Sequence, residues 1–209
     1  MLLDFSKLAP DLAYAVMIQA IVPRPIAWVL SDNGTGDDGQ GKGLNLAPFS
    51  FFNGVCGDPP MLMIACSRKP DGTRKDTLVN IEERGEFVVH SVHRELAATM
   101  VETSRVLPHG ESELTRAGLA TTPVEGWPLP RVLGPRLAIW CTRHLIANIG
   151  NEPQGLVIGQ MRGLWIDDSA GQVENGRIKI DATKLDPVAR LGGIEYVLFG
   201  EKKAIPRPS

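Results

Sequence analysis

Short apolar runs with polar residues at alternate positions recur along the chain, and they predict more strands than helices. The runs follow one another with short connections and do not alternate strictly with helices. This arrangement favours an antiparallel sheet that closes into a barrel, with a few helices packed outside it. We therefore predict a mainly β fold, with strands at 25–31, 44–54, 60–66, 86–92, 136–147, 155–166 and 195–199.

Two stretches have apolar residues at helical spacing instead. In KDTLVNIEERG we expect a helix that begins at Asp76 as its N-cap and stops at Gly85. A second helix is expected within VHRELAATMVETS, which ends at Ser104. The stretch from 105 to 135 is rich in Pro, Gly and Thr, and we predict a long excursion with one short helical turn near 112–119.

Composition and charge narrow the class of protein. The chain has 209 residues, 43% of them hydrophobic and 22% charged, with a formal net charge of −2. This length fits one domain, with two as the alternative. The balanced charge gives no clustered basic surface, so we expect neither nucleic acid nor an anionic membrane as a partner. Three cysteines without a CxxC pair indicate a reducing compartment, where they act as small apolar side chains.

One apolar run, at 12–22, resembles the hydrophobic core of a signal peptide. It is too short to span a bilayer. Asp4 and Asp11 precede it, and PRP follows where a signal peptide would have small residues at its cleavage site. We therefore expect a buried amphipathic segment in a cytoplasmic protein.

Several known binding and catalytic motifs are absent or incomplete in this sequence. Gly36, Gly41 and Lys42 have the spacing of a nucleotide-binding P-loop, but Gly43 stands where Ser or Thr would hold magnesium. The segment that follows is typical of a strand, so we interpret this stretch as a loop between two strands. The chain has no GxGxxG and no GxSxG pattern, and its four histidines lack the spacing of a zinc site.

The segment CSRKPDGTRKDTLVNI, at 66–81, concentrates polar chemistry in one strand-to-helix connection. Four cationic side chains and two hydroxyls lie here beside the free amides of a helix N-terminus. These groups together can bind a phosphate. The alternative is a solvated basic loop with an ordinary helix cap, and the local sequence leaves both open. The residues concerned are Ser67, Arg68, Lys69, Arg74, Lys75 and Thr77.

Six segments taken together are more specific than any one of them. They are PRPIAWV (23–29), NLAPFSFF (45–52), DPP (58–60), RKDTLVNI (74–81), GEFVVHSV (85–92) and LDPVARLGGIEYVLFG (185–200). In combination they resemble the flavin reductase-like family of FMN-binding split barrels. The resemblance covers roughly residues 10–200, and it implies one domain spanning 1–209.

The resemblance implies FMN bound at a homodimer interface, with its isoalloxazine ring along the segment 45–52. Pro48 has no N–H, which suits a strand that bends to present the amides of its neighbours. The residues implied to contact the ring are Asn45, Leu46, Ala47, Pro48 and Ser50. Those implied to hold the phosphate are Ser67, Arg68, Lys75, Asp76 and Thr77, and four more are placed near the cofactor: Arg24, Trp28, His90 and His144.

The implied activity is reduction of flavin by NADH or NADPH, with hydride transfer to N5 of FMN. Such a reaction depends on positioning and on charge near the ring, and it requires no acid–base residue. The reduced flavin could serve a partner monooxygenase. Two alternatives stay open: an electron-transfer protein of the flavoredoxin type with tightly bound FMN, and a flavin- or haem-binding module without turnover. The long loop at 32–43 and the excursion at 105–135, which carries Trp127, depart from the family pattern and are expected to affect access to the flavin.

Overall fold

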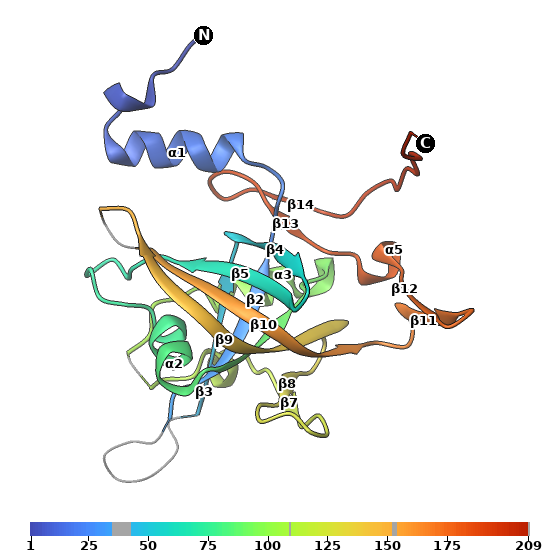
Figure 1. Cartoon of the computed structure of the whole chain (residues 1–209). Coiled ribbons are helices and arrows are strands. Elements are labelled where there is room, and N and C mark those ends of the chain that lie inside the picture. Colours follow the sequence, from blue (N-terminus) through green and yellow to red (C-terminus); the bar gives the residue numbers. More distant parts are fainter. Residues whose placement is uncertain (35–42, 109, 152–153, 209) are drawn as a thin grey trace.

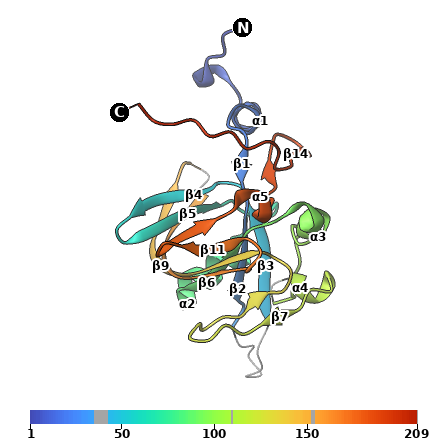
Figure 2. The same ribbon diagram turned by 90° about the vertical axis from the view of Figure 1, so that its right-hand side faces the viewer.

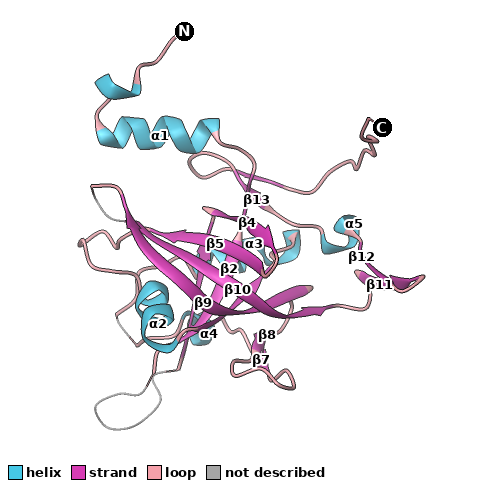
Figure 3. Ribbon diagram, in the orientation of Figure 1, coloured by secondary structure: helices cyan, strands magenta, loops and turns pink. Residues whose placement is uncertain are grey.

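Seven antiparallel strands form the main sheet of the computed structural model, which describes residues 1–34, 43–108, 110–151 and 154–208 (Figure 1). Their order across the sheet is β3–β2–β6–β9–β10–β5–β4. The predicted mainly β architecture is confirmed, and strands dominate the ribbon in Figure 3. The strands are β2 (Ala27–Asp32), β3 (Leu44–Phe49), β4 (Phe52–Gly57), β5 (Pro60–Cys66), β6 (Glu86–His90), β9 (Leu137–Ile149) and β10 (Gln154–Ile166).

Strand β2 is buried on both of its faces, because apolar layers cover both sides of the sheet at this point. Val29 on one face packs in a cluster with Phe87 and Ile64, which fills the space enclosed by the strands. Trp28 on the other face packs with Met100 and other residues that follow β6. The barrel therefore has an inner core and a second apolar layer outside β2, β3 and β6.

The predicted strand at 44–54 is divided in the structure. β3 pairs with β2, whereas β4 pairs with β5, and the chain bends between them at Ser50 and Phe51. The Ala65 N–H donates to the Phe51 carbonyl at 2.9 Å, which ties the bend to β5. The outer edge of β3 is thus not paired with another strand, and it forms the split in the barrel.

Two side chains from the excursion after β6 bind this outer edge. The Leu46 N–H donates to Oε2 of Glu113 at 3.0 Å, and the Ser112 hydroxyl donates to the Leu44 carbonyl at 2.6 Å. Glu113 is buried, and this burial raises the pKa of its carboxyl group. Polar side chains therefore satisfy the part of the edge nearest the start of β3.

The helices are short and lie outside the barrel (Figure 3). The helix predicted to begin at Asp76 is present, but its N-cap is Lys75, and Asp76 is the first helical residue. Gly85 ends this helix with a left-handed φ of 80°, as predicted. The elements are α1 (Pro10–Ala20), α2 (Asp76–Arg84), α3 (Ala97–Glu102), α4 (Glu113–Arg116) and α5 (Ala182–Leu185), with 3₁₀ turns η1 (Phe5–Lys7) and η2 (Arg94–Leu96).

Helix α1 is the apolar run that the sequence predicts to be buried, and within one chain that prediction is wrong. None of its residues is buried. In Figures 1 and 2 the helix lies beyond the end of the barrel, next to a small sheet that separates it from the core. None of the helices described here is long and apolar enough to cross a membrane.

Three small sheets complete the described structure. β1, β13 and β14 form the sheet beneath α1, β7 pairs with β8, and β11 pairs with β12. The loop that carries the P-loop spacing, with Gly36, Gly41 and Lys42, lies outside the described residues. The short strands are β1 (Arg24–Pro25), β7 (Thr121–Thr122), β8 (Arg131–Val132), β11 (Gly171–Glu174), β12 (Arg177–Ile180), β13 (Ala189–Arg190) and β14 (Tyr196–Val197).

Candidate functional site

A cavity of about 310 Å³ opens at the split between β3 and the end of β5. The bend at Ser50 and Phe51 forms its floor, with Ser67 at the end of β5 and Lys75 at the start of α2. Tyr14 of α1 and the sheet β1–β13–β14 line the opposite side. Segments far apart in the sequence therefore meet at the edge of β3, where the barrel is not closed by strand pairing.

The cavity is positively charged. Arg24, Lys75 and Arg190 line it, and no Asp or Glu does so among the residues that the structure describes. The Lys75 ammonium lies 5.6 Å from the centroid of the Phe49 ring, and the Arg24 guanidinium lies 5.9 Å from that of Phe51. Each of these two cations is thus next to an aromatic ring of the bend. Such a site favours an anionic ligand with a flat apolar part.

A smaller hollow of about 50 Å³ adjoins the cavity and shares Pro48, Lys75 and Ser104 with it. Its wall includes Asn45 and Thr77, both buried, where the Asn45 side-chain amide donates to the Thr77 hydroxyl at 2.8 Å. This hydrogen bond joins β3 to the first turn of α2. The amides of that turn favour an anion, because a helix N-terminus carries partial positive charge.

The neighbouring pair of Lys69 and Asp76 explains why Lys75 is the cation left for a ligand. Lys69 Nζ lies 2.9 Å from Oδ1 of Asp76, and both side chains are largely buried. Their charges therefore offset each other. Lys75 has no carboxylate partner among the described ion pairs, and it lines both cavities.

The structure brings together most of the residues predicted for the site. Either the main cavity or the adjoining hollow is lined by Arg24, Asn45, Ala47, Pro48, Ser50, Ser67, Lys75, Asp76 and Thr77. Five of the predicted residues line neither: Trp28, Leu46, Arg68, His90 and His144.

Leu46 and Arg68 have other partners. The Leu46 side chain is fully buried in the outer apolar layer, and its N–H already donates to Glu113. Arg68 donates to the Gly72 carbonyl at 2.9 Å across the turn that precedes α2. The basic segment 66–81 thus contributes Ser67 and Lys75 to the cavity, whereas Arg68 folds back on its own loop.

Trp28 and His90 lie inside the protein. The Trp28 indole N–H donates to the Thr103 hydroxyl at 2.8 Å. His90 accepts the Val132 N–H at its Nε2 at 3.0 Å, so its Nδ1 carries the proton and donates to the Trp28 carbonyl at 3.1 Å. Complete burial lowers the pKa of His90 to about 4. His144, by contrast, is exposed on β9.

The sequence reasoning missed Arg190 and Tyr196, which line the cavity from the C-terminal segment. One signal could have found them, because Gly192 and Gly193 between them mark a tight turn. A turn at this place puts Arg190 and Tyr196 opposite each other, and they are indeed partners in β13 and β14. Ser104 and Glu113 were missed as well, and nothing in their local sequence indicates the contact with β3.

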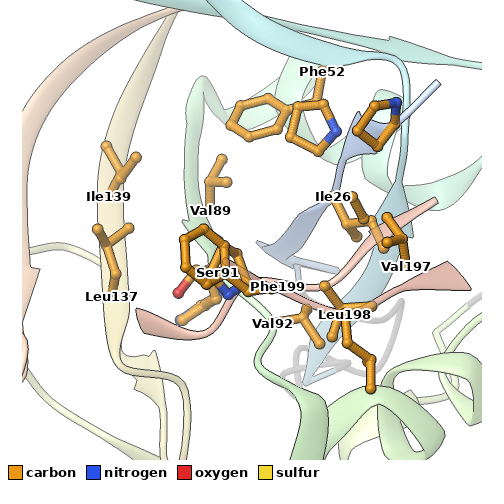
Figure 4. Close-up of a pocket in the computed structure, with 17 residues that line it drawn as sticks. Ile26, Phe52, Val89, Ser91, Val92, Leu137, Ile139, Val197, Leu198 and Phe199 are labelled. Carbon is orange, nitrogen blue, oxygen red and sulfur yellow. The ribbon is translucent and has the colours of Figure 1, made fainter. Parts of the chain in front are cut away.

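A larger cavity of about 510 Å³ lies on the other side of the small sheet, and its wall is mainly apolar. Figure 4 shows Phe52, Val89, Ile139 and Phe199 around a common space. Ile26 lines this cavity and the charged one. Of the residues predicted for the site, only His90 lines the apolar cavity, so the charged cavity is the better candidate for an anionic cofactor.

The sheet β1–β13–β14 is the partition between the two cavities. Across its strands one row of paired residues consists of Arg24, Arg190 and Tyr196, and all three line the charged cavity. The adjacent row lines the apolar cavity, and it consists of Pro25, Ala189 and Val197. Alternation of side chains along a strand explains this division.

The excursion at 105–135 touches the site with its first part only. Arg105, Val106, Leu107 and Glu113 line the small hollow, whereas Trp127 packs against Trp140, with ring centroids 6.1 Å apart. Within the described residues, no group of three or more His, Cys, Asp or Glu side chains is placed to hold a metal ion. The chemistry of the main cavity is that of cations and hydroxyls, whereas the adjoining hollow also contains the carboxylates of Asp76 and Glu113.

Comparison with known proteins agrees with this chemistry. The family model described as a flavin reductase like domain matches residues 19–179. An uncharacterised protein of Halalkalibacterium halodurans is 37% identical to the chain, over 97% of each protein. The structure is similar to nitrilotriacetate monooxygenase component B from Bacillus cereus, with a TM-score of 0.86, 32% identity and coverage of 98% of both chains. It is also similar to the 2-nitrobenzoate 2-nitroreductase NbaA of Pseudomonas fluorescens, with a TM-score of 0.85, 27% identity and coverage of 100% of this chain and 96% of NbaA.

Proposed function

The chain belongs to the flavin reductase-like family, and from this premise we propose that it is an FMN-dependent oxidoreductase that uses NADH or NADPH as its hydride donor. The observation that carries the proposal is the cavity at the split. Three cationic side chains, several hydroxyls and a helix N-terminus surround this cavity. None of its described lining residues is a carboxylate. FMN combines a phosphate with a flat ring, and the cavity offers a partner for each.

The residues present fit this cofactor. Lys75, Ser67 and the first amides of α2 would hold the phosphate, because charge-assisted hydrogen bonds favour an oxyanion there. Ser50 and the backbone of 47–50 would lie along the ring. Bound FMN supplies an acceptor for a hydride and a carrier for two electrons.

The side chains that line the cavity would position the bound ligand. The hydroxyl groups and the three cations of the cavity can orient a ligand and stabilise negative charge on a ring. None of the described lining residues is a carboxylic acid or a histidine, so we assign no proton-transfer residue. This fits hydride transfer, which needs alignment and electrostatic stabilisation from the protein.

We further propose that the reduced flavin is passed to a partner monooxygenase, since the chain is 32% identical to a protein named as a monooxygenase component. A second candidate acceptor is a small organic molecule reduced by the same protein. The apolar cavity of about 510 Å³ favours this candidate, because it adjoins the charged cavity at Ile26.

The visible spectrum of the purified protein tests the main proposal. We expect bound FMN, and bleaching of its absorption when NADH or NADPH is added without oxygen. Flavin that co-purifies but is reduced by neither nucleotide would favour the flavoredoxin-type carrier. No affinity for flavin, with or without bound haem, would contradict the proposal.

We propose that one domain spans 1–209, and that the protein is a cytoplasmic homodimer with the flavin at the interface. Helix α1 supports this, because Leu12 and Tyr14 are about half exposed and a single chain buries no residue of the helix. Tyr14 and Ile18 also line the cavity, so a second copy that covers α1 would enclose the flavin.

The dimer gives a testable expectation. Light scattering at micromolar concentration with FMN present should report twice the mass of the chain. Leu12→Glu should shift the protein toward the monomer, because it places a charge on the apolar side of α1. Gln172→Glu, at an exposed position of β11, is the control because it adds the same single negative charge away from α1. A parent protein that is a monomer would remove the shared-interface site.

A further inference from the structure

Two arginines lie directly opposite each other at one end of the charged cavity. Arg24 of β1 and Arg190 of β13 are antiparallel partners, so their side chains leave the same face of the small sheet. Arg24 is 6% exposed, and Arg190 is half-buried. Like charges placed opposite each other across strands destabilise a sheet. A negative charge next to the two arginines would offset this repulsion.

No carboxylate supplies that charge among the described residues. Arg24 donates to the Ile21 carbonyl at 2.7 Å and to the Leu191 carbonyl at 2.8 Å. Arg190 donates to the Tyr196 hydroxyl and to the Gly193 carbonyl. These partners are neutral, and an arginine stays protonated in a protein. The positive charge of the pair is thus not offset.

Hydrogen-bonding capacity is left over as well. The Nε atom of Arg24 is buried and has no hydrogen-bond partner among the described residues. Burial and the nearby Arg190 both lower the pKa of Arg24, which reflects the cost of holding two cations together. Tyr14 and Tyr196 line the same end of the cavity, with hydroxyl groups that can donate to an oxyanion.

We propose that Arg24 and Arg190, with Tyr196, form an oxyanion site for the second ligand of the flavin cavity, separate from the phosphate site at Lys75. The inference rests on the proposed function, since the second ligand is the molecule that exchanges a hydride or electrons with the flavin. Arg24 lies 5.9 Å from the centroid of the Phe51 ring and Lys75 lies 5.6 Å from that of Phe49, so the two cations are next to different aromatic rings of the cavity. A guanidinium pair suits a carboxylate or a phosphate, which it can bind through two parallel hydrogen bonds.

These two chemistries correspond to two kinds of ligand. A phosphate would come from the nicotinamide nucleotide, and a carboxylate would come from an organic acid that accepts electrons. Inorganic phosphate and benzoate are therefore the two probes. Each is titrated by calorimetry into protein saturated with FMN, which keeps the site at Lys75 filled.

The test variant is Arg190→Gln, because Arg24 also holds the C-terminal end of α1 and its loss could disturb the fold. We expect the affinity for at least one probe to fall about tenfold or more, the loss of a charge-assisted hydrogen bond. The preference for FMN over riboflavin should stay unchanged, because Lys75, and not Arg190, is the cation assigned to the phosphate. Arg190→Lys keeps the charge without the planar fork and should give a smaller loss.

Arg143→Gln is the matched control. Arg143 is also an arginine on a strand that donates to a backbone carbonyl, that of Glu82, but it is exposed and lines neither cavity. It should leave the affinity for both probes unchanged. Circular dichroism and thermal unfolding of each variant confirm that the fold is kept.

The two probes and the two flavins distinguish the possible ligands of the arginine pair. Loss of benzoate binding alone identifies a carboxylate ligand, and loss of phosphate binding identifies the nucleotide. Equal affinities of the parent and Arg190→Gln for both probes would overturn the inference. A lower affinity for FMN with an unchanged affinity for riboflavin would also overturn it, because the arginines would then hold the cofactor's own phosphate. If the parent protein binds no flavin, the proposed function is refuted instead. Comparing the phosphate affinities of the parent and Arg190→Gln then still tests the arginine pair.

Discussion

Replacing Lys75 with methionine is expected to weaken FMN binding about tenfold or more and to leave riboflavin binding almost unchanged. Methionine has an apolar stem of similar length but lacks the ammonium group, which lies 5.6 Å from the centroid of the Phe49 ring. A hydrogen bond to a charged group contributes roughly 1.5–3 kcal/mol, and riboflavin has no phosphate to make one. Fluorescence titration of both flavins against the parent and Lys75→Met measures the difference. Higher salt should weaken FMN binding to the parent more than to the variant.

Two further variants make this result specific. Arg68→Ala should change FMN affinity little, because Arg68 donates to the Gly72 carbonyl and does not line the cavity. Ser50→Ala should weaken both flavins to a similar extent, by about 1 kcal/mol, since the Ser50 hydroxyl would contact the ring. If the preference for FMN over riboflavin survives in Lys75→Met, the phosphate does not bind at the start of α2.

Stability is expected to fall steeply in mild acid because of His90. The neutral ring accepts from Val132 and donates to the Trp28 carbonyl, and protonation of Nε2 would turn the acceptor into a second donor. The pKa of His90 is about 4 in the folded protein, below the ordinary 6.5 of the unfolded chain. The contribution of His90 is therefore complete above pH 6.5 and is lost as the pH falls toward 4. Linkage gives a loss of about 2 kcal/mol in the free energy of unfolding between pH 8 and pH 5.

Two measurements check this expectation. Urea unfolding at several pH values gives the slope of the free energy of unfolding against pH. His93 is also buried and has a lowered pKa, so the slope alone does not isolate His90. Titration of the His90 ring by NMR does isolate it. A midpoint near 6.5 for that ring would contradict the assignment.

The fold could be predicted from the sequence because the strands carry their own signal. The alternation in β5 and the long apolar pair β9 and β10 are local patterns, and they set an antiparallel barrel. The break between β3 and β4 at Ser50 and Phe51 could not be predicted from the local pattern, because apolar residues continue through it. The break depends on pairing with two different strands, β2 before it and β5 after it.

The site was predictable to the extent that it is local or resembles a known family. Lys75, Ser67 and Ser50 line the cavity. Arg68, which both its charge and the resemblance placed at the phosphate, donates to the Gly72 carbonyl and does not line the cavity. The resemblance placed Trp28 and His90 near the cofactor. In the structure they are antiparallel partners on β2 and β6, both are fully buried, and neither lines the charged cavity or the hollow beside it. The contact of Arg190 with the site needs the pairing of β13 with β1, which connects residues more than 160 positions apart.

The way in which the excursion binds β3 has a consequence for how copies of this protein behave when concentrated. An unpaired strand edge is a template onto which another chain can add a strand, and growth of this kind leads to aggregates. On this edge the Leu46 N–H and the Leu44 carbonyl are already bound by Glu113 and Ser112. The next residue that faces outward is Pro48, which has no N–H to offer. The barrel therefore keeps an opening wide enough for a small molecule while giving a foreign strand almost nothing to pair with.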